Sequence, residues 1–306
     1  MNREEALELA ARGVDELVAA LEQGRSKRLL EYLAFQAQFY RYSFNNCLLI
    51  AIQKPDATLV AGFQRWKELG RFVRQGEKGI VILAPLVKRL TSDEESSRPD
   101  DEKSGRAVVG FRATHVFDVA QTDGDELPQF SVIAGEPGDL KPKLRQVIAQ
   151  QGIELRYEES LGGASGVSSG GRIAVVTGLA PAEEFAVLAH ELAHELLHRT
   201  DRRKETTRSV RELEAEAVAF VVCRAAGLDG LARSSDYIQL YQGDKEMLLA
   251  SLAHIQRVAA LIIDALTERN ETQSANGASQ SVSPSSWSRA AIGAESGPLR
   301  RTSLRR

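Results

Sequence analysis

The chain has little cysteine and no long apolar run, and each shortage excludes a class of protein. Only two of its 306 residues are cysteine, Cys47 and Cys223. They lie far apart in the sequence and form no zinc-binding or redox motif, so free thiols in a reducing compartment are expected. No apolar run approaches about 20 residues, and the first residues have an acidic amphipathic pattern, so we expect neither a membrane span nor a secretion signal. The expected location is the cytoplasm.

An excess of positive charge is also missing. The formal net charge is −3, so any nucleic-acid site must be a local basic patch on a mildly acidic body. A hydrophobic fraction of 43% is enough to build real cores. The length suits two domains and a tail.

Histidine is scarce, yet three of the five histidines fall within nine residues. His190-Glu191-Leu192-Ala193-His194 is an HExxH motif, in a segment with helical apolar periodicity that starts near Pro181. Histidines four apart share one face of a helix and can bind the same Zn²⁺ ion, while the glutamate accepts a proton from water. The motif predicts a catalytic zinc site. A short strand at 172–177 precedes it, and the edge of that strand can bind an extended peptide.

A catalytic zinc site needs a third protein ligand, and the segment after residue 211 offers three carboxylates. Glu212 and Glu216 are one helical turn apart and share a face, whereas Glu214 points elsewhere. We expect Glu212 as the ligand with Glu216 behind it, orienting a histidine, and we keep Glu216 and Glu214 as alternative ligands. His198 is also a candidate, but about 12 Å of helix separates it from His190, which favours a supporting role.

A second pattern combines cations with aromatic rings, as in proteins that bind single strands by contacting phosphates and stacking on bases. Residues 65–78 hold five cations interleaved with aromatic rings, and residues 40–46 hold a second cluster that includes amides. A packed core beneath a solvated charged face explains the same pattern. The predicted nucleic-acid contacts are Arg41, Tyr42, Asn45, Asn46, Arg65, Trp66, Lys67, Arg71, Arg74 and Lys78.

These motifs carry a family resemblance. The run from His190 to His198, followed by the three carboxylates, resembles the gluzincin-type domains of the ImmA/IrrE family and of ArdC-type antirestriction proteins. Four blocks, at 42–50, 62–71, 73–83 and 116–122, resemble in order the N-terminal domain of ArdC-like proteins. The resemblance implies a domain that binds single-stranded DNA, a zinc metallopeptidase domain with Glu212 as its third ligand, and a role in protecting the DNA of mobile elements from restriction.

The expected fold is α+β with two domains. We predict a single-stranded-DNA-binding domain over 1–130 with a mobile loop at 91–106, a linker at 131–139, a mostly helical zincin-like domain with a small sheet over 140–269, and a disordered tail from 270. Within these, helices are expected at 2–23, 140–151 and 244–268, a largely helical stretch at 26–53, and a β-rich section at 58–120.

The predicted function is single-stranded DNA binding joined to metal-assisted peptide hydrolysis, with Glu191 as general base and a possible protein substrate. Two alternatives remain. The chain is an ImmA/IrrE-like protease that cleaves a regulator, or it is a DNA-binding module whose zinc site is not catalytic. Tyr237 and Tyr241 are candidate oxyanion donors, although core packing explains both, as it does His115 and His254.

Overall fold

Capping side chains begin α1 and α3, two helices of the first half. Asn2 accepts the backbone N–H of Glu5 while the Glu5 carboxylate accepts that of Asn2, a capping box that starts α1 (Arg3–Glu22). Ser43 caps α3 (Phe44–Gln53), and α2 (Lys27–Gln38) lies between them. The structure is a computed structural model, and it describes residues 1–25, 27–89, 106–126, 136–199, 202–228 and 245–267.

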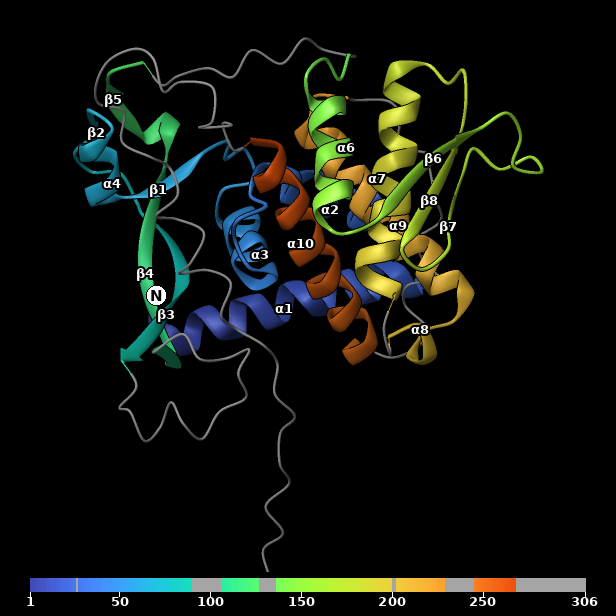
Figure 1. Ribbon diagram of the computed structural model, residues 1–306. Helices are drawn as coiled ribbons and strands as arrows, with labels where there is room; N and C mark the ends of the chain where they lie inside the picture. The colour runs from blue at the N-terminus through green and yellow to red at the C-terminus, as the bar shows by residue number, and fades with distance from the viewer. Residues whose placement is uncertain (26, 90–105, 127–135, 200–201, 229–244, 268–306) are drawn as a thin grey trace, which may run out of the picture.

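An antiparallel sheet forms the body of the first half, at the left of Figure 1. Its strand order is β1 (Val60–Gly62), β4 (Arg106–Asp118), β3 (Ile80–Arg89), with α1 and α3 packed against it. A two-stranded ribbon pairs β2 (Arg71–Val73) with β5 (Thr122–Gly124), and the 3₁₀ turn η2 (Val119–Gln121) leads into it. The predicted β-rich section is therefore interrupted by a short helix, α4 (Phe63–Glu68), which is held in place by the buried ring of Trp66.

The second half places a small mixed sheet beside a helical bundle, at the right of Figure 1. After α6 (Leu140–Gln150), β6 (Glu154–Glu158) pairs in parallel with β8 (Arg172–Val176), and β8 pairs antiparallel with β7 (Gly166–Ser168). The predicted strand at 172–177 is thus the central one, and the expectation that its edge binds a peptide is wrong, because both of its edges are already paired. The described edge strands are β6 and β7.

Among the described residues, four helices follow the small sheet. They are α7 (Pro181–His198), α8 (Arg202–Glu205), α9 (Arg208–Ala225) and α10 (Lys245–Thr267). Pro181 at the first position of α7 and Glu183 and Glu184 in its first turn match the preferences of a helix N-terminus. The predicted helices at 2–23, 140–151 and 244–268 are confirmed to within a residue or two.

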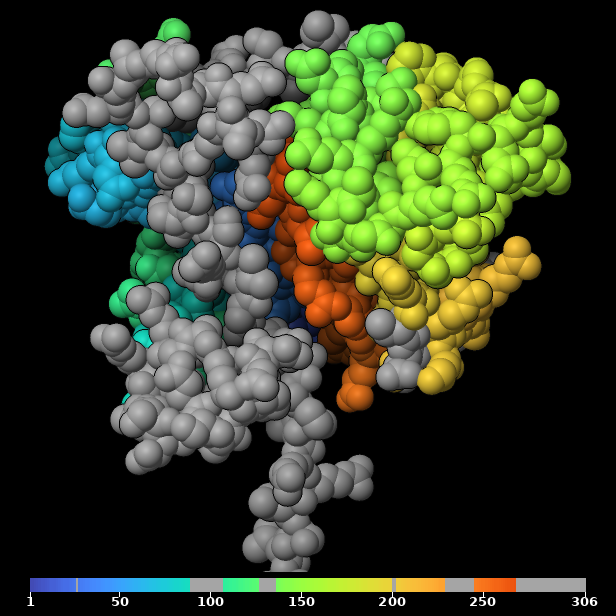
Figure 2. All heavy atoms as spheres, in the orientation of Figure 1, coloured from blue at the N-terminus to red at the C-terminus, as the bar shows by residue number. Residues whose placement is uncertain are grey.

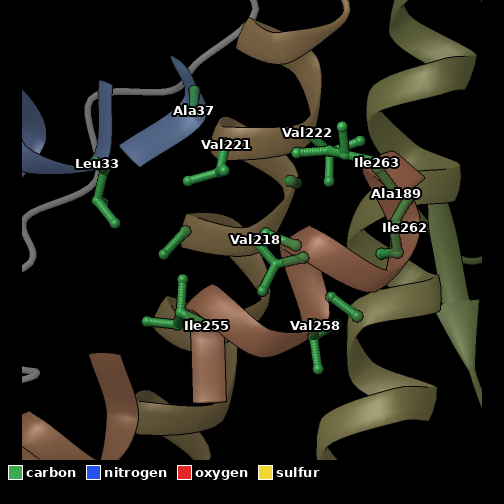
Figure 3. Packing of buried hydrophobic residues seen from close by; sticks show 14 of the residues in the cluster. Leu33, Ala37, Ala189, Val218, Val221, Val222, Ile255, Val258, Ile262 and Ile263 are labelled. Atoms are coloured by element: carbon green, nitrogen blue, oxygen red, sulfur yellow. The ribbon is translucent and has the colours of Figure 1, made fainter. Parts of the chain in front are cut away.

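One apolar core runs through both halves. Helix α2 belongs to the first half by sequence, yet it packs against α9, and α10 also packs against α9 (Figure 3). Leu33 of α2 and Val221 of α9 lie in this contact, and both are fully buried. The two-domain α+β prediction is confirmed, but the two domains share their core. The predicted boundaries stay predictions, because most of the linker, the loop at 91–106 and the tail lie outside the described residues.

Among the described helices, α10 alone is long and apolar enough to cross a membrane. In this fold its apolar side is occupied by protein: α6, α7 and α9 pack against it, and Leu252, Ile255 and Ile262 are fully buried. Figure 2 shows only a narrow strip of α10, in orange, at the surface between the two halves. We therefore assign α10 to the core.

The shared core predicts that both halves unfold together. Leu33→Ala removes buried methyl groups from the contact between α2 and α9 and should destabilise the chain by about 2–5 kcal/mol. In a Trp287→Phe background, Trp66 fluorescence reports on the first sheet and far-UV circular dichroism reports mainly on the helices. Both urea transitions should coincide and shift together. A shift in the helical signal with an unchanged Trp66 midpoint would show independent halves.

Candidate metal centre and nucleic-acid surface

Three potential ligand atoms meet where α7 packs against α9. His190 and His194 project from α7 and Glu212 projects from α9. The two histidine Nε2 atoms are 3.1 Å apart, and Oε2 of Glu212 lies 3.7 Å from the first and 3.4 Å from the second. Tetrahedral zinc with bonds of about 2.0–2.2 Å places its ligand atoms roughly 3.3–3.5 Å apart. The triangle fits such an ion, and the half-exposed Glu212 side chain opens it to solvent.

The other two carboxylates of α9 have different partners. Oε2 of Glu216 lies 3.5 Å from Nδ1 of His190, on the ring atom that faces away from the triangle. Glu214 is fully buried and contacts His198 and Arg202, so its retention as an alternative ligand is wrong in this geometry. His198 Nδ1 is 3.2 Å from His194 Nδ1, which gives His198 the expected supporting position.

The electrostatics of the triangle suit a cation. Burial lowers the pKa of His190, but the carboxylates of Glu212 and Glu216 outweigh it and raise this pKa to about 9. Burial and the neighbouring His190 lower the pKa of His194 to about 4. The hydrogen bond with His190 lowers the pKa of Glu212 to about 2. At neutral pH the site therefore offers a carboxylate and a neutral imidazole, and an arriving cation has to displace one proton from His190.

Glu191 occupies the position expected of a general base. It follows His190 on α7, is almost fully buried and faces strand β7. Burial raises the pKa of Glu191 to about 7, with Glu212 adding to the rise and the Ser168 backbone opposing it. A base whose pKa is near neutrality is effective at physiological pH. A Cβ on Gly166 would lie 2.9 Å from the Glu191 side chain, so glycine at this position lets β7 approach α7 closely.

Two further acids of α7 anchor the helix. The Glu195 carboxylate accepts the backbone N–H groups of Gly170 and Gly171, at 2.8 and 2.6 Å, and so holds the β7–β8 turn. Glu184 accepts hydrogen bonds from Tyr157 of β6 and from Lys141 and Arg145 of α6. Neither residue's role follows from the HExxH motif. Their only sequence signal is their place on the α7 surface at spacings of four and seven from Glu191.

The predicted nucleic-acid residues fall into two groups by burial. Trp66 is fully buried and donates its indole N–H to the Phe117 carbonyl, so the prediction that it contacts nucleic acid is wrong. Asn46 is also buried, and its amide pairs with both backbone groups of Leu83, so the same correction applies. Tyr42 is half-buried, and its hydroxyl donates a hydrogen bond to the Val60 carbonyl.

The predicted arginines are engaged within the protein. Arg71 donates to Thr122 and to the carbonyls of Gly124 and Asp125, and so ties β2 to β5. The others form ion pairs: Arg74 with Glu77 and Asp123, Arg65 with Glu68, and Arg41 with Asp264 of α10. Asn45, Lys67 and Lys78 are exposed.

Two family models match the chain, one in each half. Residues 8–117 match the N-terminal domain of anti-restriction factor ArdC, and residues 148–228 match the IrrE N-terminal-like domain of the M78 peptidases. The first half therefore matches an ArdC-type N-terminal domain, and the second half matches an IrrE-like domain. The IrrE-like match contains the whole His190, His194 and Glu212 triangle, so the candidate metal centre lies in a metallopeptidase-like domain.

Solved structures and a curated relative resemble this ArdC-like chain. The metal-free crystal structure of the antirestriction protein ArdC from plasmid R388 aligns with a TM-score of 0.50 and 19% identity, over 84% of this chain and 97% of that one. The Mn(II)-bound structure aligns with a TM-score of 0.47 and 21% identity, over 85% and 98%. At these identities the likeness concerns the fold alone. An uncharacterized protein of Bacillus anthracis is 27% identical over 248 residues, and the chain spans 42% of its length.

The ArdC-like N-terminal domain presents two exposed aromatic rings that are not among the nucleic-acid contacts predicted from the sequence. Phe63 and Phe72 are 49% and 59% exposed, on α4 and β2, at one end of the molecule (Figure 1). The Lys67 ammonium lies 5.0 Å above the Phe63 ring. Phe63 and Phe72 are exposed whereas Trp66 is buried, and the spacing of the three residues in the sequence does not predict this difference. Tyr237 and Tyr241, the candidate oxyanion donors, lie outside the described residues.

The Glu184 anchor predicts a pH-dependent contribution to stability. Burial opposes ionisation, but Arg145, Tyr157 and Lys141 outweigh it and lower the pKa of Glu184 to about 2, from 4.5. Because this folded-state pKa is depressed, the stabilisation is present above about pH 4.5 and is lost as the pH falls toward 2. Glu184→Gln should cost about 2 kcal/mol at pH 7, measured by urea unfolding, and the gap from wild type should shrink below pH 4.5.

Glu183→Gln is the matched control, because Glu183 lies in the same first turn of α7 and is exposed. Glu183 interacts with the helix dipole as Glu184 does, but it makes none of the Glu184 hydrogen bonds. Glu183→Gln should therefore lower the free energy of unfolding by less than about 0.5 kcal/mol. An equal loss in both variants would assign the effect to the dipole and not to the anchor.

Proposed function

We propose that this ArdC-like chain is a metal-dependent peptidase that also binds single-stranded DNA and acts in antirestriction. The observation that carries the peptidase half is the donor triangle of His190, His194 and Glu212 with Glu191 buried beside it. The IrrE-like family match over the same residues supports it. The ArdC-type match over residues 8–117 supports the antirestriction setting.

The three donors would hold Zn²⁺, whose preferred ligands include imidazole nitrogens and a carboxylate. Bound there, zinc supplies Lewis acidity, which polarises a carbonyl oxygen and lowers the pKa of water. Glu191 would take the proton from the attacking water and deliver it to the leaving amine nitrogen. Glu216 holds the His190 ring in place through Nδ1.

The described edge of β7 supports an extended peptide as the substrate. β7 is outermost in the order β6-β8-β7, and it runs beside Glu191. A peptide that added to this edge would bond through its backbone and pass the general base. This arrangement favours a peptidase over a site in which zinc only holds the fold together, since a structural site has no need of a buried base.

The metal and the base predict separate phenotypes. Purified protein should bind about one Zn²⁺ per chain, and a His190→Ala/His194→Ala variant should bind none. Glu212→Ala should weaken retention, because Glu212 completes the triangle. Glu191→Gln should keep the metal and lower peptide turnover by about 10²–10⁴-fold, because Glu191 moves a proton and is not a ligand.

Metal content by mass spectrometry and cleavage of a mixed peptide library measure the two effects. Glu183→Gln is a control for general loss of an acid on α7, because Glu183 is exposed in the first turn of the helix and lies outside the triangle. Wild-type turnover by Glu191→Gln would reject the base assignment. Full zinc in the double-histidine variant would reject the site.

The DNA half of the proposal rests on the exposed rings and cations of α4, β2 and the segment before β3. Phe63 and Phe72 offer faces for base stacking, and Lys67 and Lys78 offer charges to phosphates. The buried Trp66 and the engaged Arg71 are left out of this surface. The proposed contacts are Phe63, Phe72, Lys67 and Lys78; Asn45 is left out, because it lies beside α1 and α10.

Stacking and charge predict two distinguishable losses in the full chain. Phe72→Ala should weaken binding of a single-stranded oligonucleotide by about 1–3 kcal/mol at every salt concentration. Lys67→Glu with Lys78→Glu should weaken it mainly at low salt, because fewer counterions are released. Lys27→Glu, a charge change on α2 at a fully exposed position, is the control. Fluorescence anisotropy measures all three, and equal binding by every folded variant would move the DNA site elsewhere.

A further inference from the structure

The second ring nitrogen of His194 has an unusual partner. Its Nε2 faces the donor triangle, and its Nδ1 lies 3.2 Å from Nδ1 of another histidine, His198, one turn further along α7. We propose that His198 is a positioning residue for His194: His194 donates to His198, His198 donates to Glu214, and Glu214 also accepts from Arg202. This proposal rests on the metal site proposed above.

A histidine that binds a metal through Nε2 carries its proton on Nδ1, and that N–H needs an acceptor. Within the described residues, the hydrogen-bond partner of His194 Nδ1 is His198 Nδ1. His198 is almost fully buried, so water does not replace it as the acceptor. His198 Nδ1 must therefore carry a lone pair.

The far side of His198 fixes the same direction. Its Nε2 lies 2.9 Å from Oε2 of Glu214, and a carboxylate accepts, so this nitrogen must carry the proton. The reverse order fails at both ends. A proton on His198 Nδ1 would force the His194 proton onto Nε2, where it blocks the triangle, and would leave a lone pair facing the Glu214 oxygen.

The end of the chain is held from other helices. Glu214 is fully buried on α9, and the Arg202 guanidinium of α8 donates to both of its oxygens. Arg202 also lies 3.4 Å from the Ser251 hydroxyl of α10. The orientation of the His194 ring thus depends, through His198, Glu214 and Arg202, on how α8, α9 and α10 pack together.

The two histidines of the triangle differ in this respect. His190 Nδ1 faces a carboxylate, Glu216, at 3.5 Å. His194 Nδ1 faces a neutral ring that is itself oriented by a carboxylate. A rigid ring fixes both the position and the plane of the acceptor, so we expect His198 to set the orientation of His194 and with it the geometry of the bound metal.

The tautomers test the chain directly in the unmodified protein. Full-length protein with ¹⁵N-labelled histidine and bound Zn²⁺ is examined by long-range ¹H–¹⁵N correlation, which tells protonated from unprotonated ring nitrogens. With five histidines in the sequence the spectrum is assignable by single substitutions. We expect His194 protonated at Nδ1 and His198 protonated only at Nε2. A proton on His198 Nδ1 would overturn the proposal.

A matched pair of substitutions separates the two ends of His198. His198→Asn keeps an acceptor where Nδ1 was and loses the reach to Glu214, whereas His198→Gln reaches toward Glu214 and loses the acceptor. Zinc affinity, measured by competition with a chromophoric chelator, should fall about 10–100-fold in His198→Gln. It should stay within about threefold of wild type in His198→Asn, and the Co²⁺ absorption spectrum should follow the same order.

The outcomes distinguish this proposal from the metal site itself. If wild-type protein binds no Zn²⁺, the site fails. If it binds Zn²⁺ and both His198 variants bind equally well, or equally poorly at unchanged melting temperature, the site stands and the directional chain fails. If neither variant folds, the tautomer measurement on the unmodified protein decides.

Discussion

The packing of α7 against α9 is the contact on which the candidate site depends. Neither helix alone supplies all three donors: α7 supplies two imidazoles and the base, and α9 supplies the carboxylate. The contact also places Glu216 behind His190 and Glu214 behind His198. Each of the three acids on α9 therefore contacts a different partner. Glu212 and Glu216 share one face of the helix, one turn apart, whereas Glu214, two residues from each, points in another direction.

Much of this site could be predicted from the sequence, because its logic is local to two helices. The spacing of His190 and His194, and the pairing of Glu212 with Glu216, are properties of a 3.6-residue period. The role of Glu214 was harder to predict. Periodicity indicates that it faces away from the triangle, but its partner Arg202 lies on another helix, and no local pattern shows that contact.

The nucleic-acid surface shows where such prediction stops. Trp66 and Phe63 are three residues apart in one short helix, yet Trp66 is fully buried and Phe63 is half exposed. The difference is set by strand β4, which supplies the Phe117 carbonyl to the indole from more than fifty residues away. Cations behave in the same way: Arg71 is used to join two strands, and Lys67 is left at the surface. Composition identifies the segment, and tertiary contacts decide which side chains remain available.

Helix α2 has a consequence for how the two family domains can be separated. It belongs by sequence to the ArdC-type half, yet it packs against α9, the helix that carries Glu212. Leu33 of α2 and Val221 of α9 are both buried in this contact. An IrrE-like half expressed alone would expose that apolar face of α9 to water, and would need a substitute cover to stay monomeric. A single break in the backbone between the halves would not release them, since the two pieces would remain associated through α2 as complementing fragments.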